Sequence, residues 1–148
     1  MIKKIKALWQ KHREVLMYLI FGALTTAVDW IVSYLLYFFW GDAIEKTAIL
    51  IHVANAIAWA AAVIFAYVTN RIWVFESTRR GLLPILGEFV SFAGGRVLTL
   101  LLQEAMFVVF FHWLGISEFI VKIIAAVLVV IANYFISKLL VFKNKKEQ

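Results

Sequence analysis

Four long apolar stretches, separated by short polar ones, dominate the pattern of this chain. Each is close to the roughly 20 residues that an α-helix needs to cross a bilayer. They run over Leu16–Phe39, Ala48–Thr69, Phe89–Phe111 and Phe119–Leu140. Because their apolar positions are continuous rather than alternating, the pattern predicts helices and not the strands of a barrel. We therefore expect an all-α membrane protein whose residues 15–142 form a transmembrane domain of four helices.

The composition indicates that lipid, and not a protein core, covers these stretches. Of the 148 residues, 64% are hydrophobic and 16% are charged, whereas soluble domains are near half apolar and about a quarter charged. So small a core cannot bury the excess. The chain has no cysteine, which excludes disulfides, thiolate metal sites and cysteine nucleophiles.

The residues before the first apolar stretch follow a different pattern. Ile2, Ile5, Leu8 and Trp9 recur at helical spacing among lysines, as in a basic amphipathic helix on the membrane surface. We expect residues 1–14 to form such an interfacial segment, with a frayed charged tail as the alternative. The apolar run behind it is too long for a signal peptide, so we expect the first span to be retained.

Basic residues are concentrated at alternate connections between the spans. Most lie before the first span, between the second and third, or in and beside the basic tail 143–148, whereas the opposite loops hold only Lys46 and Lys122, beside acidic residues. The positive-inside rule therefore predicts that both termini are cytoplasmic.

The second half of the chain echoes the first. Residues 70–75 read NRIWVF and residues 137–142 read SKLLVF, which aligns Arg71 with Lys138. Each segment follows an apolar span. We interpret the spans as two parallel two-helix repeats, with a pseudo-two-fold axis along the membrane normal.

The opening helices align less clearly. Pairing Thr25 with Thr99 also pairs Asp29 with Gln103, provided that the outer loop of the second repeat is shorter. Chance similarity between two apolar helix pairs is the alternative interpretation.

Four segments together carry a pattern typical of one family. They are YLIFGALTTAVDW (18–30), FAYVTNRIWVF (65–75), the Glu-Phe-x-x-Phe-x3-Arg stretch (88–96) and ANYFISKLLVF (132–142). In these segments the chain resembles the GtrA-like family over about Leu16 to Phe142. One departure is Lys138, where family members commonly have Arg; the charge is kept but the bidentate geometry is lost.

The resemblance implies a multi-pass protein of the bacterial cytoplasmic membrane that takes part in cell-envelope polysaccharide assembly. It implies translocation of a polyprenyl-phosphate-linked monosaccharide, beside a membrane glycosyltransferase that makes this lipid. Both the lipid-linked sugar and the glycosyltransferase are therefore expected partners.

Cationic side chains near the predicted inner ends of the spans are the first candidate site. Arg71 and Lys138 close the second and fourth spans, and Arg96 lies inside the third. A charge within a span costs about 2.5–3.5 kcal/mol on insertion scales, so it needs a partner or a function. We expect these three residues to bind the lipid phosphate through charge-assisted bonds. Positive-inside anchoring, and for Arg96 an ion pair with Asp29 or Glu88, are the structural alternatives.

Polar side chains within the spans suggest a path for the sugar. Asp29 lies in the middle of the first span, where it would contact sugar hydroxyls, pair with Arg96 or exchange a proton. The other candidates are Asn70, Gln103, Glu104 and Asn133. For Asp29 the alternative is a packing role, and for the asparagines it is hydrogen bonding between helices.

Recognisable catalytic patterns are missing from the sequence. It has no nucleophile-elbow serine, P-loop or zinc-protease motif, and His12, His52 and His112 lack metal-ligand spacing. We therefore expect neither an enzyme nor a cofactor or metal site. The basic tails flank bilayer spans, so anionic lipid is a better partner than nucleic acid.

Two other functions remain open beside a lipid-sugar translocator. One is a non-transporting membrane adaptor that recruits a glycosyltransferase. The other is a small multidrug exporter, which the chain resembles only in size and in Asp29, and whose dual-topology members have more balanced loop charges. Four spans leave little room for a complete transport path, so we expect a homo-oligomer.

Overall fold

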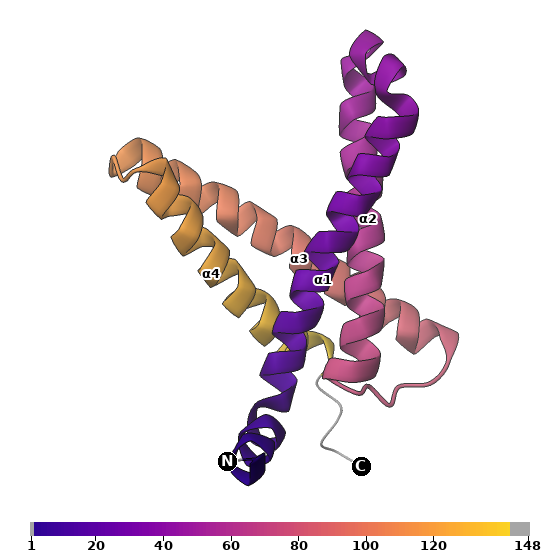
Figure 1. Ribbon diagram of the computed structural model, residues 1–148, viewed down its shortest axis with the longest axis vertical. Helices are drawn as coiled ribbons and strands as arrows, with labels where there is room; N and C mark the ends of the chain where they lie inside the picture. The colour runs from indigo at the N-terminus through magenta and orange to yellow at the C-terminus, as the bar shows by residue number, and fades with distance from the viewer. Residues whose placement is uncertain (1, 143–148) are drawn as a thin grey trace. The chain divides into compact units, whose positions relative to one another are not determined.

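Helices account for every regular element between residues 2 and 142, the range that the structure describes (Figure 1). The structure is a computed structural model in which side chains are described from His12 onward, except at residues 42, 44–46 and 48. Four helical segments are long and apolar enough to cross a membrane: His12–Gly41, Ile49–Val74, Leu82–Trp113 and Glu118–Val141. The predicted all-α architecture with four membrane-spanning helices is confirmed.

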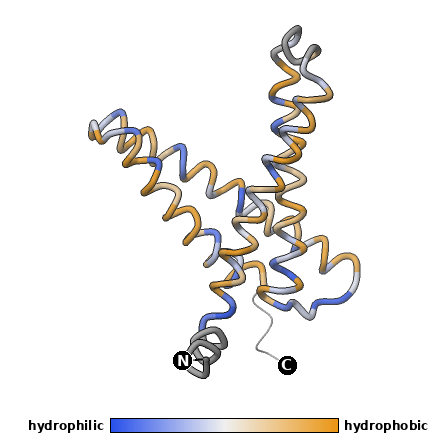
Figure 2. Tube along the Cα trace, in the orientation of Figure 1, coloured by the Kyte–Doolittle hydropathy of each residue, from blue (hydrophilic) through white to orange (hydrophobic). Residues whose placement is uncertain are grey.

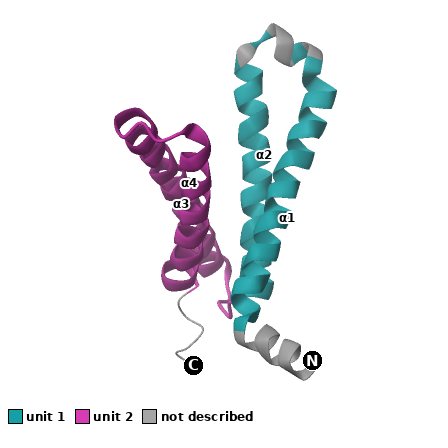
Figure 3. Cartoon of the chain, turned by 60° about the vertical axis from the view of Figure 1, so that its left-hand side comes forward, with its two compact units in different colours: residues 1–76 teal, residues 77–148 magenta. Residues whose placement is uncertain are grey.

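The chain divides into two units, residues 1–76 and residues 77–148 (Figure 3). Each unit is a hairpin of two helices. The predicted segment 1–14 has described side chains only from His12, and the predicted tail 143–148 lies outside the described residues. The interfacial and tail assignments, and the exact limits of the spans, therefore stay predictions.

The first hairpin pairs α1 (Ile2–Lys46) with α2 (Ala48–Thr69) and ends in the π-helical turn η1 (Asn70–Val74). Thr47 reverses the chain in an extended conformation, with φ −141° and ψ 99°. Small residues allow the close backbone approach on which helix packing in membranes depends. Buried alanines recur every fourth residue of α2, at Ala54, Ala58, Ala62 and Ala66.

The second hairpin pairs α3 (Leu82–Phe107) and its π-helical end η2 (Val108–Trp113) with α4 (Glu118–Ile136). It closes with the π-helical turn η3 (Ser137–Val141). Pro84 lies in the first turn of α3, where its missing N–H leaves no helical bond unmade. α3 thus begins before the predicted third span, since a helix can extend beyond the apolar stretch that crosses the bilayer.

The backbone of α3 closely approaches a side chain of α4 in the second hairpin. A Cβ atom on Gly95 would lie 2.7 Å from Cγ2 of Ile136, so a larger residue at this position would force α3 or Ile136 to shift. The neighbouring Gly94 has no such neighbour within 4 Å. This contact fixes which levels of α3 and α4 face each other.

The closing motifs of the two hairpins have the same backbone conformation. In η1 the N–H of Phe75 donates to the carbonyl of Asn70 at 2.8 Å, and in η3 the N–H of Phe142 donates to the carbonyl of Ser137 at 2.8 Å. Both are bonds of the π-helical type, five residues apart. The alignment of NRIWVF with SKLLVF is therefore structural as well as sequential.

Aromatic pairs confirm the alignment of the opening helices. Tyr18 packs against Phe75 with ring centres 6.4 Å apart and planes at 54°, and Phe92 packs against Phe142 at 6.1 Å and 56°. Tyr18 and Phe92 are separated in sequence by the same interval as Thr25 and Thr99. The internal repeat is thus present in both arms of the hairpins. The expectation of a shorter outer loop in the second copy is wrong. Thr47 alone joins α1 to α2, whereas residues 114–117 join η2 to α4, so the second copy is shorter in its helices.

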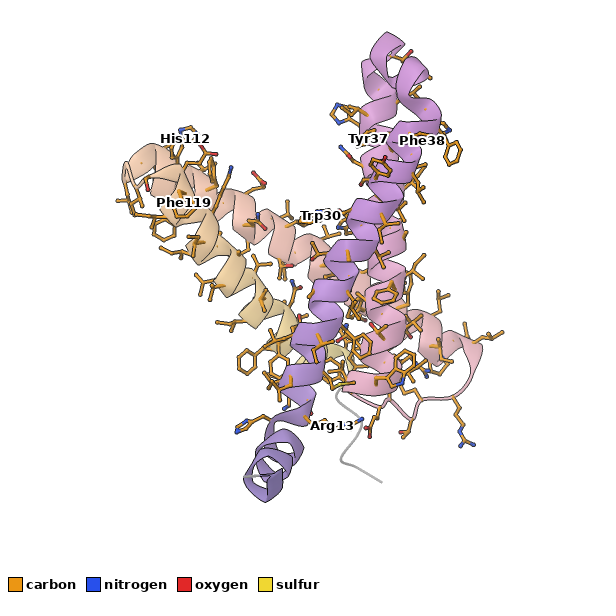
Figure 4. The ribbon with its side chains drawn as sticks, viewed as in Figure 1. Arg13, Trp30, Tyr37, Phe38, His112 and Phe119 are labelled. Carbon is orange, nitrogen blue, oxygen red and sulfur yellow. The ribbon has the colours of Figure 1, made fainter. Side chains whose placement is uncertain are left out.

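Most of the length of both hairpins is apolar in sequence (Figure 2), and many of their large apolar side chains are exposed. Phe38 is 71% exposed and Phe119 is 74% exposed, and both are labelled in Figure 4. Soluble monomers rarely expose apolar patches beyond a few hundred Å². Such a surface is stable in lipid, which supports the membrane assignment independently of hydropathy.

Candidate functional site

The ends of the two hairpins that carry the closing π-helical turns, η1 and η3, also carry cationic side chains. In the first hairpin, Arg13 donates a charge-assisted hydrogen bond to the carboxylate of Glu76, just beyond η1. This bond ties the beginning of α1's apolar stretch to the end of the hairpin. Arg71 is the second residue of η1 and is partly buried.

Lys138 has the same position in the second hairpin as Arg71 has in the first. It is the second residue of η3, and its Nζ donates to Tyr134 Oη at 3.0 Å and lies 5.3 Å from the centre of that ring. Tyr67 precedes Arg71 by the same interval. π-helical turns interrupt the regular helical ladder and occur frequently at functional sites. The fold therefore presents a cation on a π-helical turn twice.

Arg96 approaches the level of Lys138 from the other helix of the second hairpin. Its guanidinium carbon lies 5.2 Å from the centre of the Phe92 ring, a cation–π contact. Arg96 directly follows Gly95, which faces Ile136, and Ile136 lies two residues before Lys138. The structure thus brings two of the three predicted phosphate ligands to one end of one hairpin and gives the third the equivalent place in the other.

Asn70 differs from the other predicted polar residues because one of its atoms is unsatisfied. Its side chain is 1% exposed, and its Nδ2 donates to the carbonyl of Ala66 at 2.6 Å. Its Oδ1 is buried and accepts no hydrogen bond from any described residue. Leaving a buried acceptor unsatisfied costs about 1–3 kcal/mol. Asn70 is therefore not explained by hydrogen bonding between helices.

Asn133 takes part in a hydrogen bond between helices, the alternative role that the sequence suggested for it. Thr99 Oγ1 lies 3.0 Å from Asn133 Oδ1 and donates to it across α3 and α4. Asn55 has a similar role in the first hairpin, where it accepts from Tyr37 Oη at 2.6 Å. Thr25 bonds back to its own helix, at the carbonyl of Phe21.

Asp29 lies in the middle of the first hairpin. On one side of Asp29 along α1, Phe21 stacks on Trp73 with ring centres 5.5 Å apart. On the other side, Tyr37 donates a hydrogen bond to α2. Asn70 is at the Phe21 end of this interval. The structure therefore places Asp29 deeper in the hairpin than the cation of η1.

Gln103 and Glu104 line a pocket at the opposite end of the second hairpin from η3. The pocket has a volume of about 220 Å³, and its walls also include Phe107, Glu118, Lys122 and Ala125. Lys122 donates to the carboxylate of Glu118, one helical turn away. Phe107, Glu118, Lys122 and Ala125 were missed as site residues from the sequence. Glu118, Lys122 and Ala125 share an i, i+4 and i+7 spacing that places them on one face of α4. Phe107 ends α3 and carries no such signal.

These features define a multi-pass membrane protein built from two similar helical hairpins. The family model described as "GtrA/DPMS, transmembrane domain" matches residues 17–142. The chain belongs to this family, as its four sequence segments predicted.

Three curated relatives illustrate the family. The chain is 34% identical, over 98% of its length and 95% of the relative's, to the cell wall teichoic acid glycosylation protein GtcA of Listeria monocytogenes serovar 1/2a. It is 36% identical to GtcA of Listeria innocua, over 90% of this chain and 87% of the relative. It is 33% identical to the uncharacterized membrane protein YwcD of Bacillus subtilis, over 89% of this chain and 98% of the relative. No solved structure matches the chain significantly.

Proposed function

We propose that this protein translocates a polyprenyl-phosphate-linked monosaccharide across the bacterial cytoplasmic membrane. The sugar then serves the glycosylation of a cell-envelope polymer, the process named for the two GtcA relatives. The observation that carries the proposal is the paired placement of Arg71 and Lys138 on equivalent π-helical turns, with Arg96 at the level of Lys138.

Charge and depth favour a lipid phosphate as the ligand of these cations. The positive-inside rule predicts that both termini and the closing turns η1 and η3 lie at the cytoplasmic face. A polyprenyl phosphate enters from the same leaflet, with its anionic group near the headgroup level. Guanidinium and ammonium groups in a low-dielectric setting bind phosphate through short, charge-assisted hydrogen bonds. The prenyl chain remains in lipid beside the apolar outer faces.

The remaining predicted residues suit a path for the neutral sugar. Asp29 lies deeper in the first hairpin than Arg71, and Gln103 and Glu104 lie beyond Arg96 along α3. The buried, unpaired Oδ1 of Asn70 is an acceptor beside the Arg71 turn. Carboxylate and amide oxygens accept hydrogen bonds from hydroxyls, the groups that a monosaccharide presents. The protein then acts as a carrier and not as an enzyme, with a homo-oligomer completing the path.

The experiment is transport by purified protein in liposomes that contain a fluorescent polyprenyl-phosphate-linked hexose. We expect wild-type protein to move the lipid between leaflets and Arg96→Ala to reduce the rate at least tenfold. Arg80→Ala is the matched control, because Arg80 is an exposed linker arginine between the hairpins. Equal transport by wild-type protein and Arg96→Ala would contradict the proposal.

A second candidate function is an adaptor that recruits a membrane glycosyltransferase. It is favoured by the relatives' names, which mention glycosylation and not transport. An adaptor would leave the liposomes inactive but would still restore polymer glycosylation in cells when Arg96 is replaced. Loss of cellular glycosylation together with loss of transport in the same variant favours the carrier.

A further inference from the structure

The pocket at the far end of the second hairpin has the chemistry of a site for a neutral, hydroxyl-rich ligand. Its walls combine the Gln103 amide, the Glu104 and Glu118 carboxylates and the Phe107 ring. The one cation, Lys122, is already bonded to Glu118. Two carboxylates against one ammonium leave the pocket net acidic, so it repels a phosphate. Amide and carboxylate groups instead orient hydroxyls, and an aromatic ring covers an apolar face.

The size of the pocket restricts the ligand further. Its volume of about 220 Å³ is below the range of about 300–1,000 Å³ found for drug-sized ligands. One six-membered sugar ring is small enough for this volume. The pocket therefore suits a single monosaccharide.

The aromatic wall of the pocket is held in place by its neighbours. Phe107 stacks on Phe111 with ring centres 5.1 Å apart, and the His112 ring meets it edge-on at 6.3 Å. A ring fixed on two sides loses little conformational freedom when a ligand binds. The wall is therefore preorganised.

The pocket belongs to the second hairpin alone, although the hairpins are repeats. The two copies can be aligned by pairing Tyr18 with Phe92 and Phe75 with Phe142. In this alignment Glu104 corresponds to Trp30, and Phe107 corresponds to Ser33. Lys122 corresponds to Asn55, which is bonded to Tyr37. Packing is conserved between the copies, since Ala58 and Ala125 are both buried. Gln103 and Lys122 have polar equivalents in the first hairpin, Asp29 and Asn55. Glu104, Phe107 and Glu118 instead correspond to Trp30, Ser33 and Ile51. The acidic and aromatic part of the pocket is therefore not a by-product of how the repeat packs.

The location separates this pocket from the cationic end. Glu118 begins α4 and Lys138 lies on η3 beyond its end, so about 30 Å of helix separates them at 1.5 Å per residue. That is about the thickness of the hydrocarbon core.

We propose that the pocket of Gln103, Glu104, Phe107, Glu118 and Lys122 is an extracytoplasmic subsite that receives the neutral monosaccharide headgroup. This proposal rests on the proposed function for the orientation of the pocket in the membrane and for the identity of the ligand. The cationic end holds the phosphate at the start of transport, and the acidic pocket binds the sugar ring on the far side, where it repels the phosphate and assists release.

The test is binding of a neutral methyl hexopyranoside to the full-length protein in nanodiscs, measured by saturation-transfer-difference NMR over a panel of hexose stereoisomers. We expect signal for at least one hexoside. Phe107→Ala and Gln103→Leu should weaken that binding at least tenfold. Ser33→Ala, at the position equivalent to Phe107, is the matched control and should leave it unchanged. Glu104→Gln keeps the side-chain shape and guards against loss of folding; it should also weaken the binding.

Each outcome bears on one of the two proposals. Absence of signal for every hexoside overturns the sugar subsite. So does a signal as strong as that of the wild-type protein in both Phe107→Ala and Glu104→Gln. Tighter binding of a hexose 1-phosphate than of its neutral hexoside also overturns it, because the acidic pocket should disfavour the phosphate. Hexoside binding that persists in a protein without transport activity supports the subsite while contradicting the proposed function.

Discussion

Arg71 and Lys138 occupy the same position of two π-helical turns that close two separate hairpins. A cation needed only for membrane anchoring would have no reason to adopt a π-helical site in both copies, since any residue near the interface would serve. The equivalence instead indicates that each hairpin presents its cation in the same way. The two are therefore expected to contribute to one function.

Replacing these cations should distinguish the effect of their positive charge from the effect of their hydrogen-bonding geometry. We expect Arg71→Ala and Lys138→Ala each to reduce liposome transport at least tenfold, because a phosphate ligand is lost. Lys138→Arg should retain or raise the rate, since a guanidinium binds phosphate bidentately. Wild-type rates in both alanine variants would show that the cations only anchor the helices.

Gly95 should be essential for the stability of the second hairpin. In Gly95→Ala the new Cβ would lie 2.7 Å from Ile136 Cγ2, and such overpacking typically costs about 1–3 kcal/mol. We expect a lower thermal unfolding temperature in detergent. Gly94→Ala is the matched control because nothing lies within 4 Å of its added Cβ. Equal unfolding temperatures for the two variants would refute the close approach.

The bond between Thr99 and Asn133 should make a measurable contribution to helix pairing. Hydrogen bonds between membrane helices average about 0.6 kcal/mol and reach about 1.7 kcal/mol in double-mutant cycles. We expect a coupling energy in this range for Thr99→Val combined with Asn133→Ala. Thr25→Val removes only a bond within one helix, so its effect should be additive with Asn133→Ala. A coupling energy of zero for the Thr99 pair would argue against the contact.

The orientation can be tested directly because the chain has no native cysteine. We expect a membrane-impermeant maleimide to label Ser117→Cys in intact cells, since the positive-inside rule predicts that the loop before α4 lies at the outer face. Thr78→Cys, in the linker between the hairpins, should react only after permeabilisation. The reverse labelling pattern would invert the topology and place the acidic pocket inside.

Hydropathy was sufficient to predict the helices, but not the details that shape the site. Continuous apolar runs specify spans because lipid requires every backbone group to be bonded within the helix. The aligned NRIWVF and SKLLVF motifs predicted the repeat. The π-helical turns were not predicted, because one additional residue per turn leaves no mark on an apolar pattern.

Some of the candidate residues could be predicted from the sequence, and others only from the structure. Gln103 and Glu104 stood out because polar groups within a span are rare. Glu118 and Lys122 resembled ordinary loop charges at the end of a span, so only the fold revealed that they join Phe107 around a pocket. Asn70 and Asn133 looked alike in sequence, yet only Asn133 bonds across to another helix, because Thr99 faces it.

Binding of polyprenyl phosphate to the purified protein shows directly whether Arg71, Arg96 and Lys138 recognise a lipid phosphate. Native mass spectrometry can compare a polyprenyl phosphate with the neutral polyprenol of equal length. We expect the phosphate to bind wild-type protein in clear preference to the alcohol. Arg96→Ala should abolish this preference, while Arg80→Ala should keep it. Equal binding of phosphate and alcohol by the wild-type protein would show that the cations do not recognise a lipid phosphate.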